Sequence, residues 1–219
     1  MHLRTSDQEV MKLGFGDYTC NWGTHICGLY ENDEERDEII TGFLSEGMRN
    51  NDFQILIPPE DSEVPFNNDY YKRYPSLTEG INDCSKFSIV NPVQFYFPDG
   101  QFDMKRMIDS HNTYFKESQS KGKRNIRATA EMTWALKKMP GIEHLMAYEA
   151  TLNNFFPGKP WISICMYNIN KFPGKLIMHV IRTHPYIITG GVITANPFYI
   201  DPDVWLSKYS TVNTDNSEF

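Results

Sequence analysis

Residues 24–59 read THICGLYENDEERDEIITGFLSEGMRNNDFQILIPP. The apolar runs THICGLY (24–30) and FQILIPP (53–59) are typical of buried strands, and between them apolar side chains recur at helical spacing. Asn32, with Glu35 three residues later, resembles the capping box that opens a helix. The stretch therefore predicts a strand, a helix and a second strand.

The same alternation continues along the chain. Further strands are expected at 84–91, 125–136, 161–168 and 190–196, and helices from 102 to 122, after Pro140 and after Pro173. The polar stretch 60–82 is expected to be a loop or lid, 92–100 a linker, and 210–219 a frayed tail. About six alternations predict one α/β domain with a mainly parallel central sheet and helices on both faces. In such sheets, ligands bind at the carboxyl ends of the strands.

The composition favours a cytoplasmic domain. A formal net charge of −7 and a pI near 5.4 argue against direct binding to nucleic acid. The sequence contains neither a signal-peptide pattern nor an apolar run long enough to span a membrane, so we expect no membrane contact. The four scattered cysteines, Cys20, Cys27, Cys84 and Cys165, are expected to be reduced thiols.

The usual catalytic and cofactor motifs are missing. A phosphate-binding loop needs glycines and a lysine after the first strand, whereas residues 31–35 supply carboxylates. There is also no G-x-S-x-G elbow, no G-x-G-x-x-G after a strand and no H-E-x-x-H. We therefore expect no enzyme activity, no cofactor and no binding of ATP with magnesium.

A metal site can be drawn from scattered histidines and cysteines. His25 and Cys27 share one face of a strand, and Cys165 and His184 could complete a set of four ligands. Because buried reduced cysteines are common in protein cores, we assign no metal ligand at this stage.

Several polar residues at core positions need an explanation. Glu149 lies on the inward stripe of the helix after Pro140, and Asn153 shares that face. Because a buried carboxylate is costly without a partner, we expect Arg127, which has the same strand parity as Glu131, to pair with Glu149. Two interpretations stay open: a structural ion pair between helix and sheet, or a polar pocket floor formed by these three charged residues.

Two histidines and two aromatic residues can likewise be either structural or part of a ligand site. His25 begins a strand and His184 ends a helix, where imidazole has ordinary structural roles. Trp134 and Tyr167 lie near strand ends, where they can belong to the core or to a pocket wall.

Five segments together resemble a known family. They are WGTHICGLYEND (22–33), NIRATAEMTWAL (125–136), MAYEATLN (146–153), ISICMYNI (162–169) and RTHPYIITGGVITANPFY (182–199). Over about residues 15–205 the chain resembles the MEDS domain, the methanogen/methylotroph DcmR-type sensory domain. The resemblance implies a three-layer sandwich similar to the RecA/KaiC-type P-loop NTPase core, without its phosphate-binding loop. Residues 1–14 would then be an N-terminal extension, and 206–219 a disordered tail.

The resemblance also implies a site and a role. The matching motif positions are His25, Tyr30, Arg127, Glu131, Trp134, Glu149, Asn153, Cys165, Tyr167 and His184. Members of the family are thought to sense small organic molecules and are often joined to a histidine kinase or a helix-turn-helix. Gly28 and Asn168 depart from the family pattern, which weakens any expectation of an identical ligand.

The leading hypothesis is a non-catalytic sensory domain. It would bind a small organic ligand, such as a hydrocarbon or methyl-compound derivative, and signal to a separate histidine kinase or transcription regulator; self-association is left open. One alternative is a degenerate ATPase-like hydrolase or transferase that uses Glu131 or Glu149 as a base with His25. The other is a structural scaffold whose ligand site has decayed.

The predicted pocket lies at the carboxyl end of the sheet. Its walls would be Tyr30, Trp134 and Tyr167, and its polar contacts His25, Arg127 and Glu131.

Overall fold

The computed structural model describes residues 10–59, 85–120, 122 and 124–209. Its centre is a seven-stranded sheet with the order β5-β4-β6-β7-β3-β8-β9, in which only the last pair, β8 and β9, is antiparallel. The strands are β3 (His25–Tyr30), β4 (Phe53–Ile57), β5 (Phe87–Ile89), β6 (Ile126–Glu131), β7 (Trp161–Asn168), β8 (Tyr186–Thr189) and β9 (Val192–Ala195). A separate antiparallel pair is formed by β1 (Val10–Lys12) and β2 (Thr19–Asn21).

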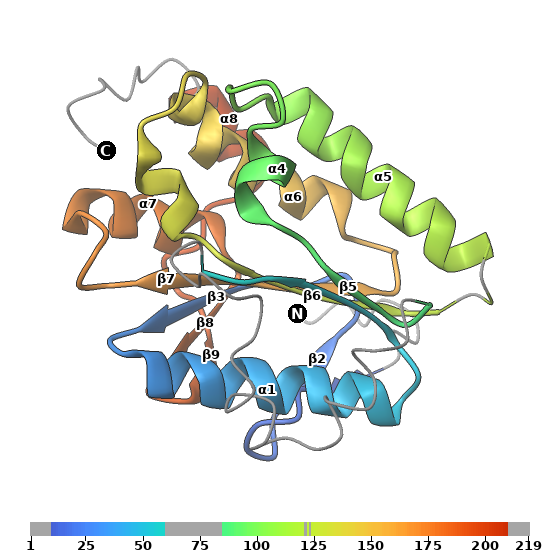
Figure 1. Cartoon of the computed structure of the whole chain (residues 1–219). Coiled ribbons are helices and arrows are strands. Elements are labelled where there is room, and N and C mark those ends of the chain that lie inside the picture. The colour runs from blue at the N-terminus through green and yellow to red at the C-terminus, as the bar shows by residue number, and fades with distance from the viewer. Residues whose placement is uncertain (1–9, 60–84, 121, 123, 210–219) are drawn as a thin grey trace.

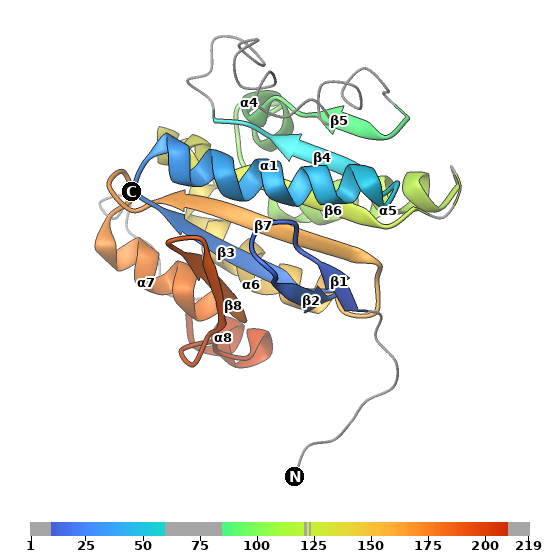
Figure 2. The ribbon, with the colours of Figure 1, turned by 90° about the horizontal axis from the view of Figure 1, so that it is seen from below.

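Helices cover both faces of the sheet, as predicted, but unequally (Figure 1). One face carries α1 (Asp33–Arg49) and the β1-β2 pair, which Figure 2 shows from below. The other face carries α4 (Pro92–Tyr96), α5 (Met104–Ser120), α6 (Leu145–Phe155), α7 (Gly174–Thr183) and α8 (Pro202–Tyr209). Short 3-10 turns, η1 (Thr133–Lys137) and η2 (Ile142–His144), lead into α6. We call these two sides the α1 face and the α6 face.

Strand β7 shows why the sheet has two cores. All eight residues of WISICMYN are buried, as expected for a strand that is covered on both sides. Its alternate side chains enter different cores: Ile162, Ile164 and Met166 pack toward α1, whereas Cys165 and Tyr167 pack toward the helices opposite. Any polar residue on a central strand must therefore find its partner on its own face.

The predicted start of α1 is confirmed. The Asn32 side chain accepts a hydrogen bond from the backbone N–H of Glu35 at 3.0 Å, and the Glu35 carboxylate accepts one from the Glu31 N–H at 2.9 Å. These two bonds, a variant of the capping box in which Glu35 reaches the residue before the cap, satisfy backbone donors that would otherwise be free, and Asp33 and Glu34 in the first turn suit the helix dipole.

Several boundaries differ from the prediction. The expected linker 92–100 begins with α4, because the Asn91 side chain caps it by accepting from the Gln94 N–H and a proline occupies its first turn. The region expected as one strand, 190–196, is the second half of a hairpin; the first half, β8, pairs in parallel with β3.

The ends of the domain also differ. Residues 206–209 belong to α8 rather than to a disordered tail, because Asp201 caps that helix by accepting from the N–H groups of Asp203 and Val204. Residues 10–14 do not simply extend from the domain, since Met11 and Leu13 are buried in the α1-face core. The expected lid at 60–82 and the expected tail at 210–219 lie outside the described residues.

Among the described residues, no helix is both long and apolar enough to span a bilayer.

The close approach of α1 to the sheet gives a stability prediction. A Cβ atom on Gly47 would lie 2.2 Å from Nε2 of Gln54 and 2.6 Å from Cδ of Arg127, and both of those side chains are fully buried. Gly47→Ala should therefore lower the free energy of unfolding by about 1–2 kcal/mol. The steric cost of the added methyl group is larger than the stability that alanine, as the better helix former, would add.

The matched control is Gly174→Ala at the first residue of α7, where an added Cβ meets nothing within 4 Å. Urea denaturation should show this variant at or above wild-type stability. Equal effects of the two substitutions would contradict close packing at Gly47.

Candidate functional site

The structure separates the ten predicted site residues onto the two faces of the sheet. Tyr30, Arg127 and Glu131 point toward α1, whereas the other seven belong to the α6 face. His25 and Tyr30 stand at opposite ends of β3, five residues and about 16 Å apart along the strand. The prediction that these residues surround one pocket is therefore wrong. Ligand contact by any single one of them stays a prediction.

The predicted pairing of Arg127 with Glu149 is also wrong. Arg127 Nε donates to Oδ2 of Asp52 at 2.7 Å, and both side chains are buried. The reason is geometric, because odd-numbered residues of β6 face α1, while Glu149 projects from α6 on the other side. The Arg127 guanidinium also lies 5.1 Å from the ring centre of Phe43, a favourable cation–π position.

Sequence reasoning missed Asp52 because the residue looks like part of a polar turn. It directly precedes β4, whose Gln54 is paired with Arg127 in the sheet. Burial raises the pKa of the Asp52 carboxyl, and the hydrogen bond and charge of Arg127 oppose that rise. We therefore interpret this pair as a structural ion pair.

A double-mutant cycle tests this pairing. Arg127→Met and Asp52→Leu should each lower the free energy of unfolding by about 3–5 kcal/mol, because each leaves one buried charge without its partner. The double variant should recover much of the loss in chemical denaturation.

The control cycle joins Arg127→Met with Glu149→Gln. Because the two side chains lie on opposite faces, their effects should add to within about 0.5 kcal/mol. A larger coupling with Glu149 than with Asp52 would contradict the observed pairing.

Tyr30 and Glu131 form a second anchor on the α1 face. The Tyr30 hydroxyl donates to Oε1 of Glu131 at 2.6 Å, and Oε2 of Glu131 accepts from the backbone N–H of Thr133 at 3.0 Å. Burial raises the pKa of Glu131, whereas the bonds from Thr133 and Tyr30 act against that rise. Since both carboxylate oxygens have protein partners, Glu131 holds the turn after β6.

Trp134 is a core residue rather than a pocket wall. It is fully buried, and its ring stacks on Tyr96 with ring centres 3.5 Å apart and on Phe102 with centres 5.9 Å apart.

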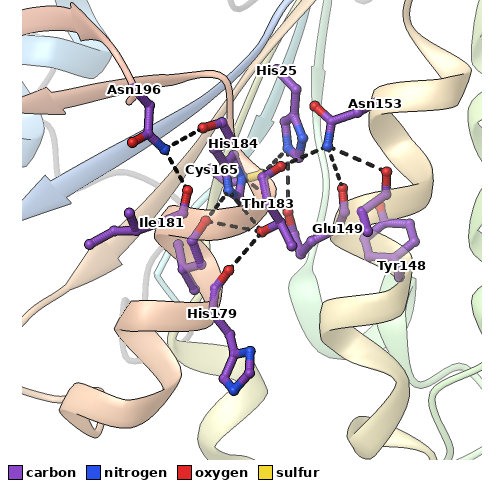
Figure 3. Close-up of polar contacts among 12 residues, drawn as sticks. His25, Tyr148, Glu149, Asn153, Cys165, His179, Ile181, Thr183, His184 and Asn196 are labelled. Carbon is purple, nitrogen blue, oxygen red and sulfur yellow. Dashed lines mark hydrogen bonds and ion pairs between the residues drawn. The ribbon is translucent and has the colours of Figure 1, made fainter. Parts of the chain in front are cut away.

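Four other predicted residues do meet, deep between the sheet and α6 (Figure 3). His25 comes from the first position of β3, Glu149 from the middle of α6, Cys165 from β7, and His184 from the residue that ends α7. We call these four residues the α6-face cluster. One ligand-capable atom from each lies within 4.8 Å of all the others, and all four residues are buried.

The contacts within the cluster converge on imidazole Nε2 atoms. Nε2 of His25 lies 3.3 Å from Sγ of Cys165 and 3.3 Å from Oε2 of Glu149. Nε2 of His184 lies 3.2 Å from the same Oε2 of Glu149. The two imidazole ring centres are 4.1 Å apart.

Surrounding residues hold the cluster in place. Nδ1 of His184 lies 2.7 Å from the carbonyl oxygen of Val180, which accepts its hydrogen and so directs Nε2 inward. The Asn153 amide donates to the Thr183 carbonyl at 2.7 Å, and the Asn196 amide to the His184 carbonyl at 2.7 Å. These bonds, visible in Figure 3, tie α6, α7 and the region after β9 together.

Burial dominates the electrostatics of the cluster. It holds the pKa of His25 well below its usual value, with further contributions from His184 and His111. Burial also raises the pKa of the Cys165 thiol well above its usual value, and the Glu149 carboxylate adds to that rise. The pKa of Tyr167, a neighbour of His184, is raised by the same two causes.

The arrangement does not resemble a Cys–His–Glu catalytic triad. In a triad, the nucleophile and the carboxylate contact different nitrogens of the imidazole. Here Cys165 and Glu149 both approach the same Nε2 of His25. All three side chains are also buried.

An open cleft of about 800 Å³ lies elsewhere, at the carboxyl ends of β3 and β8. Its lining includes four glutamates together with apolar and glycine residues, among them Leu29, Ile169 and Gly190. The glutamates are Glu31, Glu34, Glu35 and Glu38. The cleft lies at the edge that strand topology predicted for a ligand, but none of the ten predicted site residues lines it.

The cleft is closed at one point by a contact between distant segments. The backbone N–H of Gly190, in the turn between β8 and β9, donates to Oε1 of Glu35 at 2.9 Å. The carboxylate of Glu35 thus occupies backbone donors of the α1 start and of the hairpin turn. A phosphate would need such donors to be free.

Solved structures support the fold. A KaiC-like protein from Pyrococcus horikoshii OT3 superimposes with a TM-score of 0.55 and 11% identity, covering 83% of this chain and 80% of that one. Flagellar accessory protein FlaH from Methanocaldococcus jannaschii gives a TM-score of 0.51 and 13% identity, covering 83% and 81%. The predicted RecA/KaiC-like architecture is confirmed.

Sequence comparison shows the family. The transcriptional repressor DcmR of Methylorubrum extorquens is 24% identical over 161 residues, which are 73% of this chain and 57% of the repressor. The chain thus spans little more than half the length of this curated relative. The sequence model of the methanogen/methylotroph, DcmR sensory domain matches residues 24–185. The chain belongs to the MEDS family of sensory domains.

Proposed function

We propose that this MEDS domain senses a small organic molecule in the cleft at the carboxyl ends of β3 and β8, without catalysing a reaction. The observation that carries the proposal is the cleft itself. It occupies the edge of a P-loop-like sheet where ligands bind, and carboxylates stand where phosphate donors would be required. Its volume of about 800 Å³ lies within the usual range for small-molecule sites.

The lining of the cleft narrows the class of ligand. Four glutamates disfavour anions, and the apolar side chains of Leu29 and Ile169 can contact alkyl groups. An uncharged or cationic hydrocarbon or methyl-compound derivative fits both features.

The contact between Glu35 and Gly190 offers a route for the signal. Both residues line the cleft, and their hydrogen bond joins the start of α1 to the β8-β9 turn. A ligand that entered between them would change how the hairpin sits against α1. The likeness to a transcriptional repressor supports an output to transcription regulation.

The cleft can be tested with matched tryptophan substitutions. A thermal-shift screen of uncharged and cationic small organic molecules should find compounds that raise the melting temperature, since such ligands bind only the folded chain. Ile169→Trp fills the cleft wall and should weaken the affinity of those compounds at least about tenfold.

The control is Met178→Trp on α7, a position of similar exposure, 44% against 40% for Ile169, that does not line the cleft. Met178→Trp should bind the same compounds with the affinity of the wild type. Ligands that bind both variants equally would place the sensory site elsewhere, and a screen without any ligand would favour the decayed scaffold.

ATP with magnesium should not bind at this edge. The Glu35 carboxylate already holds donors at the start of α1, and the neighbouring glutamates repel phosphate. Isothermal titration calorimetry should show no binding at micromolar concentrations. Micromolar affinity that is lost in Ile169→Trp would instead support the ATPase-like alternative.

A further inference from the structure

The α6-face cluster has no part in the proposed sensing cleft, yet it gathers four ligand-capable side chains from four elements. We propose that His25, Glu149, Cys165 and His184 bind one divalent transition-metal ion of the Zn²⁺ type. The set differs from the one considered from the sequence, because Glu149 takes the place of Cys27.

Three of the distances between the ligand atoms match a tetrahedral site. With Zn–N and Zn–O bonds of about 2.0–2.1 Å and a Zn–S bond of about 2.3 Å, the edges of a tetrahedron are about 3.3 Å for N–O and about 3.5 Å for N–S. The observed N–O separations are 3.3 and 3.2 Å, and the N–S separation is 3.3 Å. Three of the six edges thus already have tetrahedral length, and the other separations between ligand atoms are at most 4.8 Å, so an ion that enters would draw the remaining atoms inward.

The orientation of the side chains also favours a metal. Nδ1 of His184 is bound to the Val180 carbonyl, so its Nε2 faces Glu149, and in the neutral ring that nitrogen carries a lone pair. Among the described residues, Nε2 of His184 and the carboxylate oxygens of Glu149 lack a hydrogen bond of good geometry, although Glu149 lies close to both histidines and interacts with the Cys165 and Tyr167 side chains. Acceptors that point at one spot favour a shared cation, and histidine ligands held through Nδ1 to a carbonyl are usual in metal sites.

Charge balance leads to the same conclusion. Glu149 is fully buried, and in the described part of the chain its ion-pair partners are the two histidines, with no lysine or arginine. The nearby candidate, Arg127, is bound to Asp52 on the opposite face. A divalent ion would compensate the carboxylate and a Cys165 thiolate together.

The donor set selects the class of metal and its role. Imidazole, thiolate and carboxylate together suit Zn²⁺ rather than Mg²⁺ or Ca²⁺, which prefer oxygen ligands. Four protein ligands without solvent access are typical of a closed, structural site. Such an ion would fasten α6 and the end of α7 to β3 and β7.

The experiment uses the full chain expressed with added Zn²⁺ and purified without chelator. Elemental analysis should give one Zn²⁺ per chain. After removal of the metal under denaturing conditions and refolding, Co²⁺ should produce the visible bands of a tetrahedral site together with a thiolate-to-cobalt band. X-ray absorption of the zinc form should show one sulfur near 2.3 Å and nitrogen or oxygen ligands near 2.0–2.1 Å.

Paired cysteine variants identify the thiolate. Cys165→Ser should lose the thiolate-to-cobalt band and bind Co²⁺ at least about tenfold more weakly. Cys27→Ser is the matched control, because Cys27 is equally buried and pairs with Cys165 across β3 and β7. The Cys27→Ser variant should keep the thiolate-to-cobalt band.

Two results would overturn the proposal. One is a folded wild-type chain that contains no metal after growth in Zn²⁺ and shows no spectral or thermal change with Co²⁺ or Zn²⁺; the cluster would then be held by a shared proton. The other is a bound metal whose X-ray absorption shows no sulfur or two sulfurs, which decides the matter even if Cys165→Ser does not fold. Neither result bears on ligand binding in the cleft.

Discussion

The buried polar contacts of the central strands depend on a sheet that is covered on both faces. Successive side chains of a strand point to opposite faces, so a charged residue on a central strand is buried wherever it points and can be compensated only from its own side. Arg127 meets Asp52 beneath α1, and Glu149 meets two histidines beneath α6. The sheet between them keeps two opposite charges apart that would otherwise be natural partners. The domain thus has two independent polar centres.

Local sequence signals predicted the elements well. The eight buried residues of β7 and the capping box of α1 are encoded within short stretches, and both occur where the sequence indicates. Short elements were missed, either because a neighbouring strand places them or because a single capping residue starts them. The four residues of β8 gain their place by pairing with β3, and α4 and α8 depend on single capping side chains, Asn91 and Asp201.

The candidate site was harder to predict than the fold. The sequence identified His25, Glu149, Cys165 and His184 as unusual residues, but strand parity alone could not say which of them share a face. Asp52 could not be found at all, because it lies 75 residues from Arg127 and nothing local distinguishes it from an ordinary turn residue. The cleft escaped notice for a similar reason, since its walls come from the start of α1, the end of β7 and the hairpin turn. Partners that are distant along the chain are set by topology.

The position of β8 has a practical consequence for anyone who divides this protein into fragments. The family match ends at residue 185, one residue before β8 begins. A fragment cut there would leave the β3 backbone, now paired on both sides, with a row of unpaired N–H and C=O groups along one edge. Such an open edge can recruit strands from other molecules, so the cut would turn an interior strand into a site of aggregation. The unit that protects its own sheet extends past the end of the family match, through the hairpin that covers β3.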